Sequence, residues 1–274
     1  MRVHPYRAQR DGASRREGGL MNWPLVAVRT LHFGSAMLVF GELLFVSIVA
    51  SAAWSRTVAS APGKGGLLQR HVQVVSAWAL LVSVASGAAW LVIEAATMAG
   101  TTLARALDAR TLALVLRETE FGHVWLLRAV LLVILAMSVI GIRRAKSDAA
   151  RARRMPIALL LAALYLASLA WAGHAAAAMQ GALRALHLAS DASHLLAAGA
   201  WLGALPALVY CLASAQPNDA IARVTRRFSL LGMISVSVLL ASGIVNAYFL
   251  VGSFAALFGT PYGRTLIIKL AVFA

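Results

Sequence analysis

Long apolar runs separated by short polar stretches dominate the chain. Seven such runs lie at 30–53, 72–96, 121–142, 156–174, 185–211, 229–252 and 265 onward. A bilayer core of ~30 Å is crossed by about 20 residues of α-helix, and the runs lack the strict alternation of β-strands. We therefore predict an all-α fold, a polytopic bundle of transmembrane helices. The seventh run has only ten residues, 265–274, so we expect a truncated helix there.

Composition supports a membrane protein and argues against nucleic-acid binding. Hydrophobic residues make up 61% of the chain and charged residues 13%, about half the charged share of a soluble domain. The net charge is +15, but the basic residues lie in short loops between apolar runs and form no basic face interleaved with aromatic residues. The single cysteine, Cys211, excludes an internal disulfide and a thiolate cluster within one chain.

The basic loops predict the orientation. The loop 143–154 carries six Lys or Arg residues and is expected on the cytoplasmic side. Alternation then places the loop 97–120 outside, together with the N-terminus. Residues 1–20 contain five arginines and conflict with that placement. We expect them to be a disordered or mis-annotated extension before a transmembrane domain at 21–274 that is incomplete at its C-terminal end.

Histidines gather toward one predicted membrane face. In the predicted helix 185–211, His187, Asp191 and His194 are spaced i, i+4, i+7 and therefore share one helix face. Two imidazoles and a carboxylate inside a bundle can bind a metal or relay protons. They can equally be interhelical hydrogen-bond partners, with Asp191 paired to Arg128. The other histidines predicted near the outer ends of helices are His32, His123 and His174.

Four further polar residues fall within or beside the apolar runs. They are candidates for an ion path or for charge pairing: Glu42, Arg128, Asn246 and Lys269. Ionisable groups at membrane depth are costly and often functional, but each of these also has a structural interpretation. Asn246 follows Ser242 and Gly243 and can act as an interhelical hydrogen-bonding group, whereas Lys269 can extend toward the interface.

Several short motifs resemble those of the copper resistance protein D (CopD) family. They are Gly173-His174, the stretch from Leu186-His187 through Asp191 and His194 to Gly199–Gly203, Arg227-Phe228-Ser229, Ser242-Gly243 with Asn246, and Thr260–Arg264 leading to Lys269. The resemblance covers most of the chain from about residue 21. It implies an eight-helix bacterial inner-membrane protein, with no known enzymatic reaction, that handles copper (Cu⁺ or Cu²⁺) and takes it up from the periplasm. It also implies a periplasmic copper-binding partner of the CopC type.

Two other functions stay open from the sequence. A haem b-binding electron carrier needs two histidines at matched depth on facing helices, and transmembrane electron flow usually needs a second pair near the other face. His71 is the one histidine expected there. A membrane assembly subunit that binds no ligand needs none of the histidines.

Overall fold

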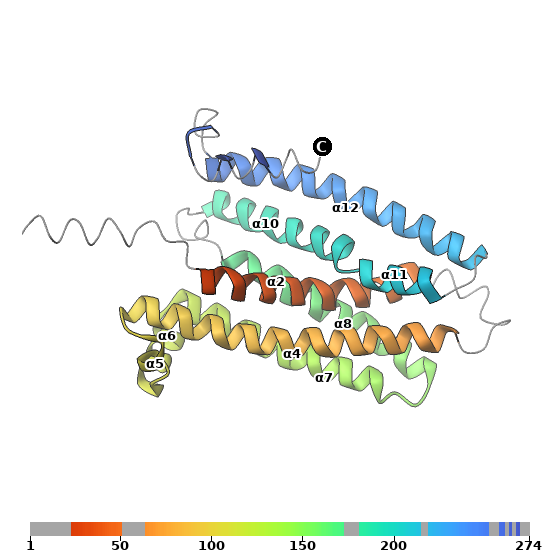
Figure 1. Cartoon of the computed structure of the whole chain (residues 1–274), viewed down its shortest axis with the longest axis horizontal. Coiled ribbons are helices and arrows are strands. Elements are labelled where there is room, and N and C mark those ends of the chain that lie inside the picture. The colour runs from red at the N-terminus through yellow and green to blue at the C-terminus, as the bar shows by residue number, and fades with distance from the viewer. Residues whose placement is uncertain are drawn as a thin grey trace, which may run out of the picture.

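The computed structural model (Figure 1) describes residues 23–50, 64–172, 181–214, 219–251, 258–260, 263–264 and 267–268. In these segments the regular structure is helical. The elements are α2 (Trp23–Leu44), η1 (Phe45–Ala50, a π-helix), α4 (Lys64–Ala99), α5 (Leu103–Ala106), α6 (Ala109–Glu118), α7 (Glu120–Arg143), α8 (Asp148–Ser168), η3 (Leu169–Ala172, a 3₁₀-helix), α10 (Gly181–Leu202), α11 (Leu205–Ser214) and α12 (Asp219–Val251).

Within the described residues, six helical segments are long and apolar enough to cross a membrane. They are Trp23–Ala50, Gly66–Ala99, Glu120–Arg143, Asp148–Ala172, Gly181–Ala213 and Asp219–Phe249. Helices satisfy their own backbone hydrogen bonds, which is why apolar runs of this length fold as helices in a bilayer. The all-α polytopic bundle is therefore confirmed. The run from 265 lies almost entirely outside the described residues, as do residues 1–22.

The helix ends fall on two sides of the bundle in the alternating order expected from the loops. Figure 1 shows the start of α2, the end of α4, the helices α5 and α6, and the start of α10 at one end. The α7–α8 connection and α11 lie at the other. We call the first the outer end and the second, which carries the basic loop 143–154, the inner end.

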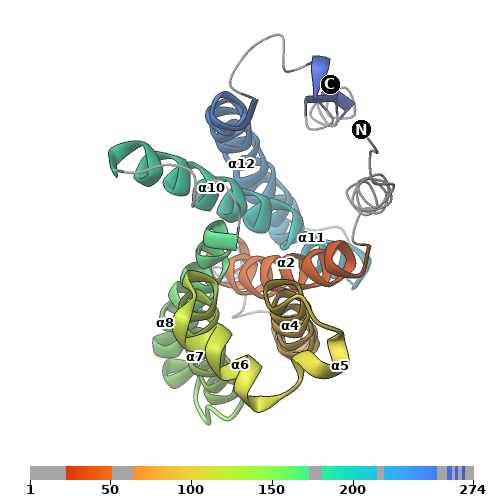
Figure 2. The same cartoon turned by 90° about the vertical axis from the view of Figure 1, so that its left-hand side faces the viewer.

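The structure extends the sequence prediction at two places. The loop 97–120 contains the short helices α5 and α6, which lie across the outer end (Figure 2). The fifth span is broken between Leu202 and Leu205. Pro206 explains this break, because proline lacks a backbone N–H donor and fits best in the first turn of a new helix.

Glycines fix α10 against α2. A Cβ atom built on Gly203 would lie 2.0 Å from the carbonyl oxygen of Met37, and one on Gly41 would lie 2.1 Å from the backbone of Gly203. Only glycine permits such an approach of two backbones. Viewed along the bundle, α2 lies between α10 and α12 on one side and α4 on the other (Figure 2). Two regions with buried histidines result, one on each side of α2.

Candidate metal site between α10 and α12

His187 and Asp191 lie together on the face of α10 that packs against α12. The His187 side chain is 2% exposed, and its Nε2 atom lies 3.7 Å from Oδ2 of Asp191. The imidazole stacks on the ring of Phe249 from α12, with centroids 4.9 Å apart. The i, i+4 spacing therefore brings an imidazole and a carboxylate together at this helix interface.

Neither ring nitrogen of His187 makes a hydrogen bond, although both are buried. The 3.7 Å separation from Asp191 exceeds hydrogen-bond distance. Buried polar groups in proteins nearly always have a partner, so His187 is an exception that calls for a physical cause. A free imidazole lone pair beside a carboxylate is the donor arrangement that a metal ion or a proton can use.

Polar groups from α12 complete this interface. The Nδ1 atom of His194 lies 3.0 Å from the hydroxyl of Ser242, and Ser190 donates to the Ser242 carbonyl at 3.1 Å. The side-chain oxygen of Asn246 is buried without a hydrogen-bond partner. Because Asn246 follows Ser242 by four residues, both occupy the α12 face toward α10. We call the group His187, Ser190, Asp191, His194, Ser242 and Asn246 the α10–α12 seam.

The seam holds two imidazoles around one carboxylate, since Asp191 interacts electrostatically with both His187 and His194. Within the segments that the structure describes, no three His, Cys, Asp or Glu side chains converge closely enough to enclose a metal ion by themselves. A metal at this seam would therefore need movement of His194 toward Asp191, or other donors such as the Asn246 oxygen.

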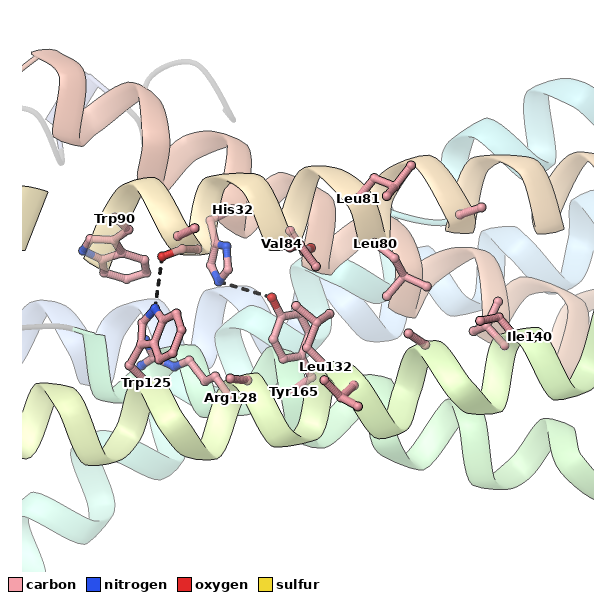
Figure 3. A pocket seen from close by; sticks show the side chains of 18 of the residues that line it. His32, Leu80, Leu81, Val84, Trp90, Trp125, Arg128, Leu132, Ile140 and Tyr165 are labelled. Atoms are coloured by element: carbon pink, nitrogen blue, oxygen red, sulfur yellow. Dashed lines mark hydrogen bonds between the residues drawn. The ribbon is translucent and has the colours of Figure 1, made fainter. Parts of the chain in front are cut away.

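His32 belongs to α2, and its imidazole contacts α4 and α8, with both ring nitrogens in hydrogen bonds. Its Nδ1 atom is 3.0 Å from the hydroxyl of Ser86, and its Nε2 atom is 3.2 Å from the hydroxyl of Tyr165. Ser86 gives its own proton to the Val82 carbonyl at 2.6 Å. Ser86 therefore accepts from Nδ1–H of His32, and Tyr165 donates to the Nε2 lone pair. Figure 3 shows the bond between His32 and Tyr165.

His123 is also separate from the seam. The Nε2 atom of His123 lies 2.8 Å from the carbonyl oxygen of Arg117 in α6. His174 and Lys269 lie outside the described residues. Of the six metal candidates, the structure thus brings His187 and Asp191 together, with His194 close by, and it places His32 and His123 elsewhere.

The charged residues Arg128 and Glu42 lie apart from the seam as well. Arg128 donates to the carbonyl of Ser168 at 3.0 Å and lies over the ring of Trp90. This arrangement replaces the pairing with Asp191 that we weighed from the sequence. Glu42 is 0% exposed, and neither of its carboxylate oxygens has a hydrogen-bond partner. It interacts electrostatically with Cys211 of α11.

Sequence reasoning missed the side chains that hold the histidines. Tyr165 bonds to His32, and Ser242 bonds to His194. Their hydroxyl groups interrupt otherwise apolar runs, and that was the available signal. Phe249 had no signal, because an aromatic residue in an apolar helix looks the same whether it packs on lipid or on an imidazole.

Comparisons with known proteins identify the family. The profile of the copper resistance protein D-like N-terminal domain matches residues 20–185, and that of copper resistance protein D matches residues 222–274. The chain belongs to the copper resistance protein D family. Residues 186–221, which include the α10 part of the seam, lie between the two matched ranges.

Three similar proteins have names that refer to copper or to the inner membrane. Copper resistance protein D of Pseudomonas syringae pv. tomato is 31% identical over 260 residues, covering 90% of this chain and 77% of the relative. Inner membrane protein YebZ of Escherichia coli (strain K12) is 30% identical, covering 89% and 77%.

Copper transport protein CutJ of Bacillus subtilis (strain 168) is 36% identical over 160 residues. That match covers 57% of this chain and 29% of the longer relative. No solved structure matches the chain.

Proposed function

We propose that this protein binds copper within the membrane at the α10–α12 seam, with His187 and Asp191 as the first ligands, and passes it across a bacterial inner membrane. The observation that carries the proposal is the buried imidazole of His187, which has no hydrogen bond at either nitrogen and lies 3.7 Å from a carboxylate. The choice of copper as the metal rests on the family, because its relatives are named for copper transport and copper resistance.

The donor chemistry fits copper. Copper binds imidazole strongly, and nitrogen with oxygen donors favours Cu²⁺ over Cu⁺, which prefers thiolate and thioether ligands. His194 and the free oxygen of Asn246 are the nearest further donors of the seam. Copper is thus a substrate that enters a partly formed site, and an incomplete ligand set suits a metal that has to leave again.

The direction that we propose is uptake from the periplasm. The basic loop 143–154 argues for a cytoplasmic inner end, and His187 lies in the half of α10 nearer the outer end (Figure 1). A periplasmic CopC-type protein is then a natural donor of copper. Glu42, buried on α2 without a hydrogen-bond partner, is the next carboxylate on an inward route.

Two measurements on one set of variants test the proposal. Copper bound by the purified protein and copper uptake by cells are compared for the wild type, His187→Ala and His71→Ala. His71 stacks on Tyr210, with ring centroids 4.2 Å apart. His71→Ala therefore removes a histidine that lies away from the seam. We expect copper binding and uptake to be lost in His187→Ala and kept in His71→Ala.

The same set separates the alternative functions. Equal copper content in all three proteins would refute the seam as the copper site and would favour an assembly subunit without a ligand. A haem Soret band in the purified wild type would favour the electron carrier. The two ring nitrogens of His32 are already hydrogen-bonded to Ser86 and Tyr165, which speaks against His32 as a haem ligand.

A further inference from the structure

A cavity of about 490 Å³ lies between α4 and α7, on the side of α2 away from the seam. His32, Trp90, Trp125, Arg128 and Tyr165 surround its outer part (Figure 3). The cavity contributes nothing to the copper site proposed above. Its size falls within the range of small-molecule sites, about 300–1,000 Å³.

The two ends of the cavity differ in chemistry. Toward the outer end, two indole rings, an imidazole, a phenol and a guanidinium line it, whereas toward the inner end the walls are aliphatic, from Leu80 and Leu81 on α4 to Leu132 and Ile140 on α7 (Figure 3). Arg143, the exposed last residue of α7, lines the inner end. A molecule that fits has a compact, flat polar head and a long apolar tail.

One hydrogen-bond donor in the polar part has no acceptor. Arg128 is 4% exposed, and its Nε–H is buried without a partner while the other end of the guanidinium donates to Ser168. The other polar groups of this part already have partners, since Tyr165 donates to His32, the Trp90 indole donates to Glu94 and the Trp125 indole donates to the Gly87 carbonyl at 3.0 Å. The described lining residues include no carboxylate. An acceptor oxygen from a ligand in the cavity would satisfy this Nε–H.

The depth of Arg128 decides which class of ligand supplies that oxygen. Arg128 is the ninth of the 24 residues of α7, about 12 Å along the helix from its start at 1.5 Å per residue. Phospholipid phosphates stay at the interface of the bilayer, whereas the ring of a lipid-soluble quinone enters the hydrocarbon region. A quinone carbonyl can accept from Arg128, its ring can pack against Trp90 and Trp125, and its isoprenoid tail can follow the aliphatic walls.

We propose that the cavity between α4 and α7 binds a membrane quinone, with a ring carbonyl at Arg128 and the tail between Leu80 and Ile140. The proposal concerns binding and stands independently of copper at the seam. An acyl chain of a bilayer lipid is the other occupant of similar shape, and the test below separates the two.

The test uses the full chain in nanodiscs of phosphatidylcholine and phosphatidylglycerol, so that lipid chains are always in excess. Decylubiquinone is titrated in, and quenching of tryptophan fluorescence reports binding next to Trp90 and Trp125. We expect saturable binding to the wild type. The absence of saturable quenching would overturn the proposal and would assign the cavity to lipid chains.

Two neighbouring positions on α7 supply a matched pair of variants. Ala136 lines the cavity, whereas Met137 is 66% exposed on the lipid-facing surface. Ala136→Phe fills the cavity and is expected to weaken decylubiquinone binding about tenfold or more, which corresponds to about 1.4 kcal/mol, whereas Met137→Phe leaves it unchanged. Arg128→Gln, which removes the free donor, is expected to weaken binding to a similar extent.

Equal binding by Ala136→Phe and Met137→Phe would place the quinone elsewhere and refute the proposal. Size-exclusion chromatography of each variant establishes that it is folded before titration. Should Arg128→Gln not fold, the Ala136 and Met137 pair and the wild-type titration still decide the outcome.

Discussion

The two buried histidines His32 of α2 and His187 of α10 have opposite environments. His32 has both ring nitrogens in hydrogen bonds, to Ser86 and Tyr165, and it packs against Trp90 with ring centroids 5.6 Å apart. His187 is equally buried, but neither of its nitrogens has a hydrogen-bond partner and a carboxylate lies beside it. Burial of a histidine in a membrane bundle is therefore not by itself a mark of a metal ligand. The proposed ligand His187 combines buried ring nitrogens that make no hydrogen bond with an adjacent carboxylate, whereas His71, whose Nε2 also lacks a hydrogen bond, stacks on Tyr210.

The largest loss of stability is expected from a substitution at the close contact between Gly203 and α2. In Gly203→Val, the added side chain would occupy the space of the Met37 carbonyl oxygen, 2.0 Å from the Cβ position. Overpacking of this kind costs about 3 kcal/mol or more, so we expect little folded protein in the membrane.

Gly34→Val on α2 is the control for that variant, because a Cβ atom at Gly34 meets nothing within 4 Å. Fluorescence-detected size-exclusion chromatography compares the folded yields. Equal yields would show that α2 and α10 do not approach as closely as described.

The next largest effect separates the two histidines directly. His187→Ala removes a proposed copper ligand and should lower copper affinity more than about tenfold, since loss of a group that merely supports a ligand already costs about 10–100-fold. His32→Ala should leave copper affinity unchanged, because its nitrogens are engaged by Ser86 and Tyr165. Competition with a chelator measures both, and a larger loss in His32→Ala would reverse the assignment.

Acidification should weaken copper binding at the seam. An imidazole binds metal only when neutral, so we expect copper affinity to fall as the pH drops below about 6. Protons then compete with the metal for the imidazole lone pairs, and copper binding is regained as the pH rises. Copper binding measured between pH 5 and 7.5 tests this, and a constant affinity across that range would argue against histidine ligands.

The smallest effect concerns the hydrogen bonds of the His32 region. Tyr165→Phe removes only the hydroxyl that donates to His32 and should lower the free energy of unfolding by about 1 kcal/mol, typical of interhelical hydrogen bonds in membranes. Copper affinity should not change. Thermal unfolding in detergent measures the change in stability. A large loss of copper affinity in Tyr165→Phe would show that the His32 region and the seam are coupled.

The sequence predicted the bundle well because each span is long and apolar, and a bilayer leaves such a run no alternative to a helix. It also predicted the adjacency of His187 and Asp191, since that follows from helical periodicity alone. It could not separate His32 from the seam, because the partners of His32 lie 54 and 133 residues away. Contacts between helices depend on how the helices pack, and the periodicity of one helix does not predict this packing.

The break at Pro206 shows a smaller limit of the same kind. The apolar run 185–211 continues through it, so hydropathy alone predicts one helix where the structure has α10 and α11. Proline was a readable signal there. The free carboxylate of Glu42 was not, since only the folded structure shows that it has no hydrogen-bond partner.

Electron paramagnetic resonance of the Cu²⁺-loaded protein tests the central claim most directly, because imidazole nitrogens bound to Cu²⁺ give a distinct hyperfine pattern. The wild type and His32→Ala are expected to give the same nitrogen signal, and His187→Ala is expected to lose it or to show one nitrogen fewer. An unchanged signal in His187→Ala, with a loss in His32→Ala, would contradict the assignment of copper to the α10–α12 seam.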